Sequence, residues 1–149
     1  MSKAPKKSAT LGGTADETEA SFYEALQTGD IERLMACWAD DDEVICVHPG
    51  SPRLVGLGAV RAAFDAVLSH GGVRIQMEAL RKLEHMTCAV HSVRERIDIL
   101  TNEGTVQAYA LATNVYFKTA QGWRMVAHHV SAGGANESED ISDSPHVLH

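Results

Sequence analysis

The sequence predicts an α+β domain, with helices in its N-terminal half and an antiparallel sheet in its C-terminal half. Residues 14–72 contain three stretches whose apolar side chains recur at helical spacing. Residues 87–132 contain three long alternating stretches joined by short turns, as in an antiparallel meander. Helices segregated from an antiparallel sheet form an α+β fold. If that sheet is strongly curved, it encloses a cavity beneath the helices.

The first two predicted helices form a helical hairpin with clear signals at each end. Thr14 can cap the first helix while Glu17 reaches back to it, and Gly29 can end that helix. Asp30 follows at once and can cap a second helix, predicted over residues 31–40.

The predicted strands begin with a short apolar run that ends at a Pro-Gly turn. This run covers residues 43–48, and residues 53–56 can pair with it across the turn. A third helix is predicted over residues 58–72, because apolar side chains return to helical spacing there. The remaining strands are predicted at residues 73–83, where the strand signal is weakest, 87–100, 105–118 and 123–132.

Length and composition suit one domain, expected at residues 14–133 of the 149. Segments 1–13 and 134–149 lack apolar periodicity and are expected to be disordered, the second being acidic. The net charge of −7 argues against nucleic acid as a partner, because phosphate backbones require clustered lysine and arginine. No secretory signal or membrane span is expected, and the three widely spaced cysteines favour a reduced, cytoplasmic setting.

His48 raises the first functional question, because it ends an otherwise apolar strand face shared with Val44 and Cys46. Two interpretations remain open. His48 either bonds to backbone or water at the strand end, or faces a cavity as a general base. Cys46 lies about 7 Å from His48 between Cα atoms, which favours a small buried hydrophobic role over a thiol nucleophile.

The order of elements and several short signatures resemble the SnoaL-like group of the NTF2-like superfamily, over about residues 14–133. The signatures are G-D…W-A-D-D…V…H-P-G…G…A-V-R-A-A-F and the final G-W-R-M-V-A-H-H-V-S. The resemblance implies a cone-shaped barrel, in which three helices pack on a curved, mainly antiparallel sheet around a deep pocket. Members include ketosteroid isomerases, polyketide cyclases, dehydratases and noncatalytic transport or oligomerisation domains, so the fold alone leaves the function open.

Comparison with ketosteroid isomerases argues against that specific activity. Their carboxylate base lies directly before a proline at the end of the first strand, where this chain has His48 and Pro49. The positions that match their oxyanion-hole donors are Phe22 and about Ala110, neither of which can donate a hydrogen bond. Asp65 stands where a tyrosine is expected, and it can orient the His48 imidazole if its helix faces that residue.

The resemblance also selects the strand faces that line the pocket. In the last strand it turns His129 inward and leaves His128 on the outer sheet face, where family members commonly dimerise. His91 and Asn114 can contact a ligand, or they can serve as core residues that hold neighbouring strands. The residues expected to contact a ligand are Phe22, Trp38, His91, Asn114 and Tyr116.

Two functions of different classes follow from these residues. The first is a cofactor-independent proton-transfer enzyme acting on an apolar organic substrate, with His48 as base and His129 as a polarising group. The second is a noncatalytic ligand-binding or assembly module that dimerises through the outer sheet face; Phe22 and Ala110 favour it. No cofactor is expected. No metal site is expected either, because His48, His91 and His129 lack local ligand spacing.

Overall fold

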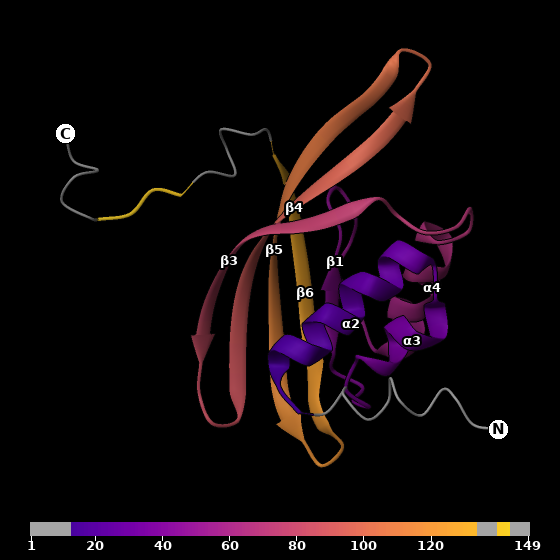
Figure 1. Cartoon of the computed structure of the whole chain (residues 1–149). Helices are drawn as coiled ribbons and strands as arrows, with labels where there is room; N and C mark the ends of the chain where they lie inside the picture. The colour runs from indigo at the N-terminus through magenta and orange to yellow at the C-terminus, as the bar shows by residue number, and fades with distance from the viewer. Residues whose placement is uncertain (1–12, 134–139, 144–149) are drawn as a thin grey trace.

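Three helices lie on one side of a six-stranded sheet within residues 13–133 and 140–143, which the structure, a computed structural model, describes (Figure 1). Most of the two segments predicted to be disordered lies outside these residues. The helices are α2 (Ala15–Thr28), α3 (Ile31–Ala36) and α4 (Leu57–Val67). The strands are β1 (Ile45–Val47), β2 (Leu54–Val55), β3 (Ile75–Glu84), β4 (Cys88–Thr101), β5 (Gly104–Thr119) and β6 (Gly122–Gly133).

The predicted helix caps form, but the second helix is shorter than predicted. The Thr14 side chain accepts from the Glu17 backbone N–H, and Gly29 ends α2 with φ of 75°. Helix α3 ends at Ala36 because the chain then joins the sheet, where Trp38 forms an isolated parallel bridge with Met125. The prediction of helix through residue 40 is therefore wrong.

The sheet is mixed and open at both edges, in the order β2-β1-β6-β5-β4-β3. Strand β1 runs parallel to β6, and every other neighbouring pair is antiparallel. The weakly signalled run at residues 73–83 forms most of β3 and is confirmed as a strand. The predicted α+β architecture is confirmed, with an open curved sheet in place of a closed barrel.

A bulge in β6 changes which of its side chains face the helices. Val115 pairs with Ala127 while Tyr116 pairs with Met125, so Val126 is an extra residue in the ladder. One inserted residue exchanges the two faces of a strand beyond it. Met125 and His128 therefore both point toward the helices and are buried.

The segment between α4 and β3 lies against the C-terminal end of α2. The Val73 backbone N–H donates to the Leu26 carbonyl at 2.8 Å. A Cβ on Gly72 would lie 1.9 Å from the Gln27 carbonyl oxygen, so the two backbones meet where only glycine fits. This approach fixes the start of β3 beside the helices, where Val73 and Ile75 line the site described next.

Candidate functional site

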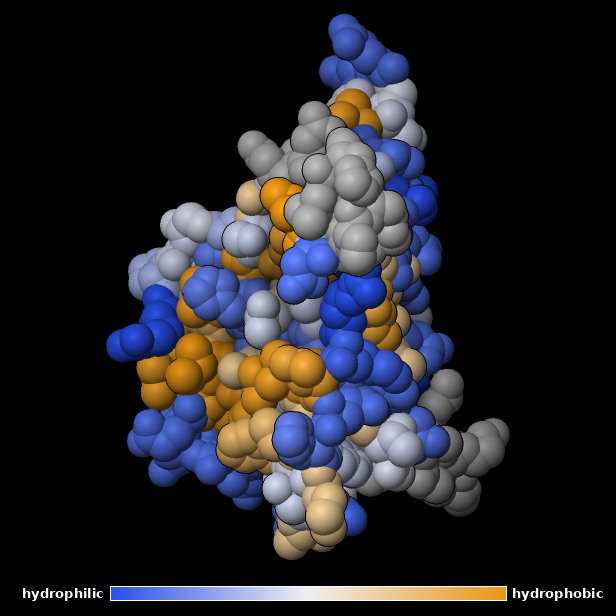
Figure 2. Space-filling view, turned by 90° about the vertical axis from the view of Figure 1, so that its left-hand side faces the viewer, coloured by the Kyte–Doolittle hydropathy of each residue, from blue (hydrophilic) through white to orange (hydrophobic). Residues whose placement is uncertain are grey.

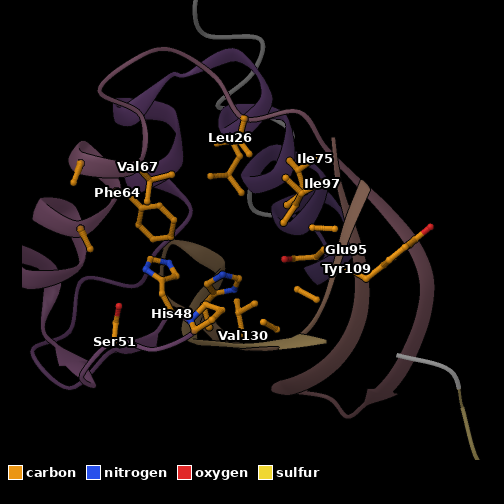
Figure 3. A pocket seen from close by; sticks show the side chains of 18 residues that line it. Leu26, His48, Ser51, Phe64, Val67, Ile75, Glu95, Ile97, Tyr109 and Val130 are labelled. Carbon is orange, nitrogen blue, oxygen red and sulfur yellow. The ribbon is translucent and has the colours of Figure 1, made fainter. Parts of the chain in front are cut away.

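A cavity of about 610 Å³ lies between the sheet and the helices α2 and α4. Its lining is largely apolar, as expected of sites that bind small organic molecules. Figure 3 shows these side chains around the open space. The larger apolar residues of the lining are Leu26, Phe64, Val67, Ile75, Ile97 and Val130.

A few polar side chains interrupt the apolar lining, and they are His48, Ser51, Glu95 and His128. Glu95 points into the cavity (Figure 3). Tyr109 also borders the cavity, but its ring points away in the same view. The Arg94 guanidinium carbon lies 4.5 Å from the centre of that ring, a cation–π contact that accounts for its orientation.

His48 stands at the cavity wall directly after β1, as the general-base interpretation requires. Its half-buried ring packs edge-on against Phe64, with 5.1 Å between ring centres, and lies 6.0 Å from the ring of His128. Desolvation by burial lowers the pKa of His48 below its ordinary value. The imidazole is therefore neutral near pH 7 and can accept a proton, and its catalytic role stays a prediction.

Cys46 lies closer to His48 than the strand spacing suggested. Its sulfur is 3.7 Å from Nε2 of His48. The objection that the two groups are too far apart is therefore wrong. Burial raises the pKa of the Cys46 thiol to about 12, so it is a neutral thiol and not a nucleophile at neutral pH.

His128 and His129 occupy the reverse of their predicted positions. His128 lines the cavity and is 3% exposed, with its ring 5.1 Å from that of Phe22. His129 is exposed and pairs with Thr113 on the outer face. The bulge at Val126 is the physical reason, because it shifts the alternation on which the prediction relied. Burial, helped by the adjacent His48, lowers the pKa of His128 to about 3.

Three of the predicted ligand-contacting residues meet around a buried carboxylate instead of lining the cavity. Glu19 accepts hydrogen bonds from Nδ1 of His91 at 2.8 Å, from the amide of Asn114 at 3.1 Å and from the Tyr116 hydroxyl at 2.7 Å. All four side chains are buried, Glu19 on α2 and the other three on strands β4 and β5. His91 and Asn114 therefore take the core role that was left open for them, and none of the three residues belongs to the lining of this cavity.

This buried polar network reaches the cavity at two points. The Asn114 amide nitrogen also donates to the Tyr23 hydroxyl at 3.1 Å, and Tyr23 in turn donates to Glu95 at 2.6 Å. Nδ1 of His128 lies 2.6 Å from Oδ1 of Asn114. Burial raises the pKa of Glu95 above its ordinary value, although the bond from Tyr23 opposes this.

Glu19, Tyr23 and Glu95 are the site residues that the sequence reasoning missed. A usable signal existed for Glu19, which shares the apolar stripe of α2 with Phe22 and Leu26 at helical spacing. A carboxylate in that position is buried and therefore needs partners. For Glu95 the signal was its alternation with His91 on one face of β4.

The other predicted site residues lie outside the cavity wall. Phe22 is fully buried behind it and packs edge-on against Phe64, with 5.8 Å between ring centres. Trp38 is buried where the chain meets β6. Asp65 is exposed, with Oδ2 3.8 Å from Nε of Arg61, so the expected contact with His48 is not formed among the described residues.

A group of possible metal ligands lies at the other end of the network, where Asp16, Glu84 and His91 bring ligand atoms within 4.8 Å of one another. Lys82 already places its ammonium 3.0 Å from Asp16, which neutralises part of the charge. Burial alone would lower the pKa of His91, but the hydrogen bond and charge of Glu19 outweigh it and raise that pKa. A protonated His91 between Glu19 and Glu84 fits this group as an ion-pair cluster.

The comparisons with known proteins agree with this fold. The SnoaL-like domain model matches residues 16–134. A candidate calcium/calmodulin-dependent protein kinase type II association domain from Thiobacillus denitrificans is 34% identical, with a TM-score of 0.74, over 82% of this chain and 97% of that one. A candidate dehydratase of the NTF2-like family from Streptomyces avermitilis is 24% identical, with a TM-score of 0.70, over 88% and 99%.

Another solved structure of the same fold is the CaMKII hub of S. rosetta, 18% identical, with a TM-score of 0.66, over 78% of this chain and 92% of that one. A search of curated proteins found no match. Among the described residues, no helix has the length and apolar character needed to cross a membrane.

Proposed function

Because the chain belongs to the SnoaL-like domain family of the NTF2-like superfamily, we propose that its cavity binds an apolar small molecule and performs proton transfer on it. One observation carries this proposal. Three titratable side chains, His48, Glu95 and His128, share a lining that is otherwise almost wholly apolar. Perturbed titratable groups within an apolar pocket are typical of functional sites.

The geometry supports His48 as the general base. Its neutral imidazole removes a proton from a carbon or oxygen of the bound molecule and becomes an imidazolium. Glu95, whose pKa is raised by burial, is suited to deliver a proton elsewhere on the same molecule. The result is an isomerisation or elimination in which one proton leaves at His48 and one arrives from Glu95, without a cofactor.

Ligand binding is tested with N-phenyl-1-naphthylamine, a neutral dye that fluoresces in apolar surroundings. We expect saturable one-to-one binding to the wild-type chain. Ala110→Phe places a ring in the cavity and is expected to abolish the binding, because Ala110 lines the cavity from β5. Thr113→Phe is the matched control, since Thr113 is exposed on the same strand. Equal binding by both variants, or none by the wild type, would overturn the proposal.

The proposed proton transfer is tested separately. A screen of enolisable ketones and alcohols first identifies a compound that the protein converts. His48→Gln is expected to lower kcat by about 10²- to 10⁴-fold, the usual contribution of a general base. Ser51→Ala is the control, because Ser51 lies at the same wall without a titratable group. Unchanged turnover in His48→Gln removes its assigned role.

A second candidate function is assembly through the outer sheet face, favoured by the 34% identical candidate association domain. On the side away from the helices, apolar side chains gather between hydrophilic ones (Figure 2). On β5, the 48% exposed Phe117 and half-buried Val115 share the strand face opposite the buried Asn114 and Tyr116. We propose that a second copy of the chain covers this face.

Light scattering after size exclusion tests the assembly proposal. We expect a dimer or larger oligomer for the wild type and a monomer for Phe117→Glu, because a buried unpaired charge opposes association. Leu100→Glu is the control, since Leu100 is also exposed but lies near the tip of the β4–β5 hairpin. A monomeric wild type at high concentration refutes this proposal and leaves the ligand site intact.

The three cysteines support a reducing compartment, such as the cytoplasm, as the place of action. Cys37, Cys46 and Cys88 are all free thiols, and Cys37 and Cys46 are buried. Proteins with unpaired cysteines are typical of reducing compartments. Fractionation of cells that express the tagged chain tests this, and recovery from an oxidising compartment would overturn it.

A further inference from the structure

We infer that His128 presents a fixed hydrogen-bond acceptor, Nε2, to the cavity, so that the site selects neutral ligands that donate a hydrogen bond there, such as alcohols or phenols. This inference rests on the proposed ligand site and deepens it. Asn114 is then a positioning residue, because it sets the proton position on His128 without lining the cavity.

The first step is the orientation of the Asn114 amide. Its nitrogen lies 3.1 Å from a carboxylate oxygen of Glu19 and 3.1 Å from the Tyr23 hydroxyl oxygen. The Tyr23 proton is already donated to Glu95, so the Tyr23 oxygen accepts from Asn114. A reversed amide would set its oxygen against two acceptors. The NH₂ group therefore faces Glu19 and Tyr23, and the carbonyl oxygen faces His128.

The second step is the tautomer of His128. An amide oxygen only accepts hydrogen bonds, so Nδ1 of His128, 2.6 Å from Oδ1 of Asn114, must carry a proton. Burial lowers the pKa of His128 to about 3, which keeps the imidazole neutral near pH 7. A neutral imidazole holds a single ring proton. Nε2 is therefore left as a bare lone pair.

The third step is the position of that lone pair. His128 belongs to the cavity lining, and Nε2 has no hydrogen-bond partner within the described ranges. Phe22 and Phe64 flank the ring, with centres 5.1 and 6.2 Å away, and neither can donate a conventional hydrogen bond to it. A ligand that displaces water from this acceptor without replacing its hydrogen bond loses affinity, so a ligand that supplies an O–H or N–H is favoured there.

The fourth step is the charge of the ligand. No lysine or arginine lines this cavity among the described residues, and both of its imidazoles have lowered pKa values. An anion would lose its hydration without gaining a cation, which disfavours carboxylates and phosphates. The ligand class that fits is an apolar skeleton carrying a neutral hydroxyl group.

Three naphthalene probes that share one ring system and differ in a single substituent test the selection by displacement of N-phenyl-1-naphthylamine. We expect 2-naphthol to bind about 10-fold more tightly than 2-methoxynaphthalene, which accepts but cannot donate, and 2-naphthoate to bind most weakly. In His128→Phe the preference for 2-naphthol is expected to vanish. Equal binding of 2-naphthol and 2-methoxynaphthalene overturns this inference but leaves the proposed ligand site standing. If no naphthalene or dye binds, both are refuted.

Nitrogen-15 NMR of the histidine rings tests the tautomer without any ligand. In the wild type we expect a protonated Nδ1 and a bare Nε2 on His128. In Asn114→Leu, the His128 ring is expected to lose its preference for a proton on Nδ1, and the selection for 2-naphthol is expected to weaken. Tyr116→Phe is the matched control, because it removes another bond to Glu19 but leaves the Asn114–His128 contact. A protonated Nε2 in the wild type overturns the inference, even if Asn114→Leu fails to fold.

Discussion

The hydroxyl of Tyr23 donates a 2.6 Å hydrogen bond to Oε2 of Glu95. Tyr23 lies on α2 and Glu95 on β4, so this bond joins a helix to the sheet where the carboxyl group enters the cavity. Tyr23 is itself held by Asn114. The orientation of the cavity carboxyl is therefore set by buried groups that a ligand does not touch.

Tyr23→Phe is expected to raise the pKa of Glu95 further, because the hydrogen bond from Tyr23 is what lowers it. The free energy of unfolding is expected to fall by about 1–3 kcal/mol, since Glu95 loses a donor and the buried Asn114 amide loses an acceptor. Carbon-13 NMR titration of Glu95 and urea denaturation measure the two effects. Tyr109→Phe is the control, because the Tyr109 hydroxyl bonds to Gln107 and not to the buried network. An unchanged Glu95 titration would contradict the role given to Tyr23.

The chain is expected to lose stability as the pH falls from about 6.5 toward 3, in part through His128. The pKa of His128 is about 3 when folded and near 6.5 when unfolded, so the unfolded chain binds the extra proton in this window. His128→Phe is expected to lose less stability than the wild type between pH 7 and 4.5.

Urea denaturation at the two pH values measures that difference. Glu95 has the opposite effect on stability. Its pKa is higher in the folded chain than in the unfolded chain, so it stabilises the folded state as the pH falls toward the pKa of the unfolded chain. The comparison between variants separates its contribution from that of His128. His129→Gln keeps the buried His128 and is expected to keep its acid sensitivity. Identical pH slopes for wild type and His128→Phe would refute the assignment.

Cys37 and Cys46 are expected to resist alkylation by iodoacetamide at pH 8 in the folded chain. Burial raises their pKa values to about 11 and about 12, so almost no thiolate forms, and both sulfurs are enclosed. Cys88 is half-buried and serves as the internal comparison. Mass spectrometry of timed samples measures the labelling. Labelling of Cys46 as fast as in the urea-unfolded chain would show that it is accessible.

Gly72→Ala is expected to lower the free energy of unfolding by about 2 to 3 kcal/mol, within the usual range for single substitutions. Its Cβ would lie 1.9 Å from the Gln27 carbonyl oxygen, so the segment must move away from α2. Gly58→Ala in α4 is the matched control, with nothing within 4 Å, and is expected to gain about 0.5 kcal/mol from helix propensity. Urea denaturation of both variants measures these changes in unfolding free energy. Equal changes in Gly72→Ala and Gly58→Ala would show that the close approach of the two backbones is not required.

Much of the architecture could be predicted because its signals are local. Thr14 and Gly29 cap α2 in the structure as they do in the sequence pattern. The predicted strand order of the meander from β4 to β6 is also confirmed. Caps and alternation act over a few residues, so they can be read without knowledge of neighbouring strands.

The candidate site was predicted only in part, because its composition depends on contacts between distant elements. The end of β1 and the Pro-Gly turn are local features, so His48 was singled out as a strand-end or cavity residue, and the structure places it in the cavity lining. Glu19 was missed, because its partners His91, Asn114 and Tyr116 come from strands 72 to 97 residues away. Pairings over such separations leave no periodic trace around either residue.

The amino-acid sequence by itself determined both ends of α2, the succession of the strands and the apolar strand face that ends in His48. Only the tertiary structure decided which imidazole of the His128–His129 pair enters the cavity. Val126 bulges because β6 must pair with β5 on one side while meeting Trp38 and β1 on the other. The alternation of residues within one strand does not show where a bulge will form. A single inserted residue exchanges the two faces of the strand beyond it.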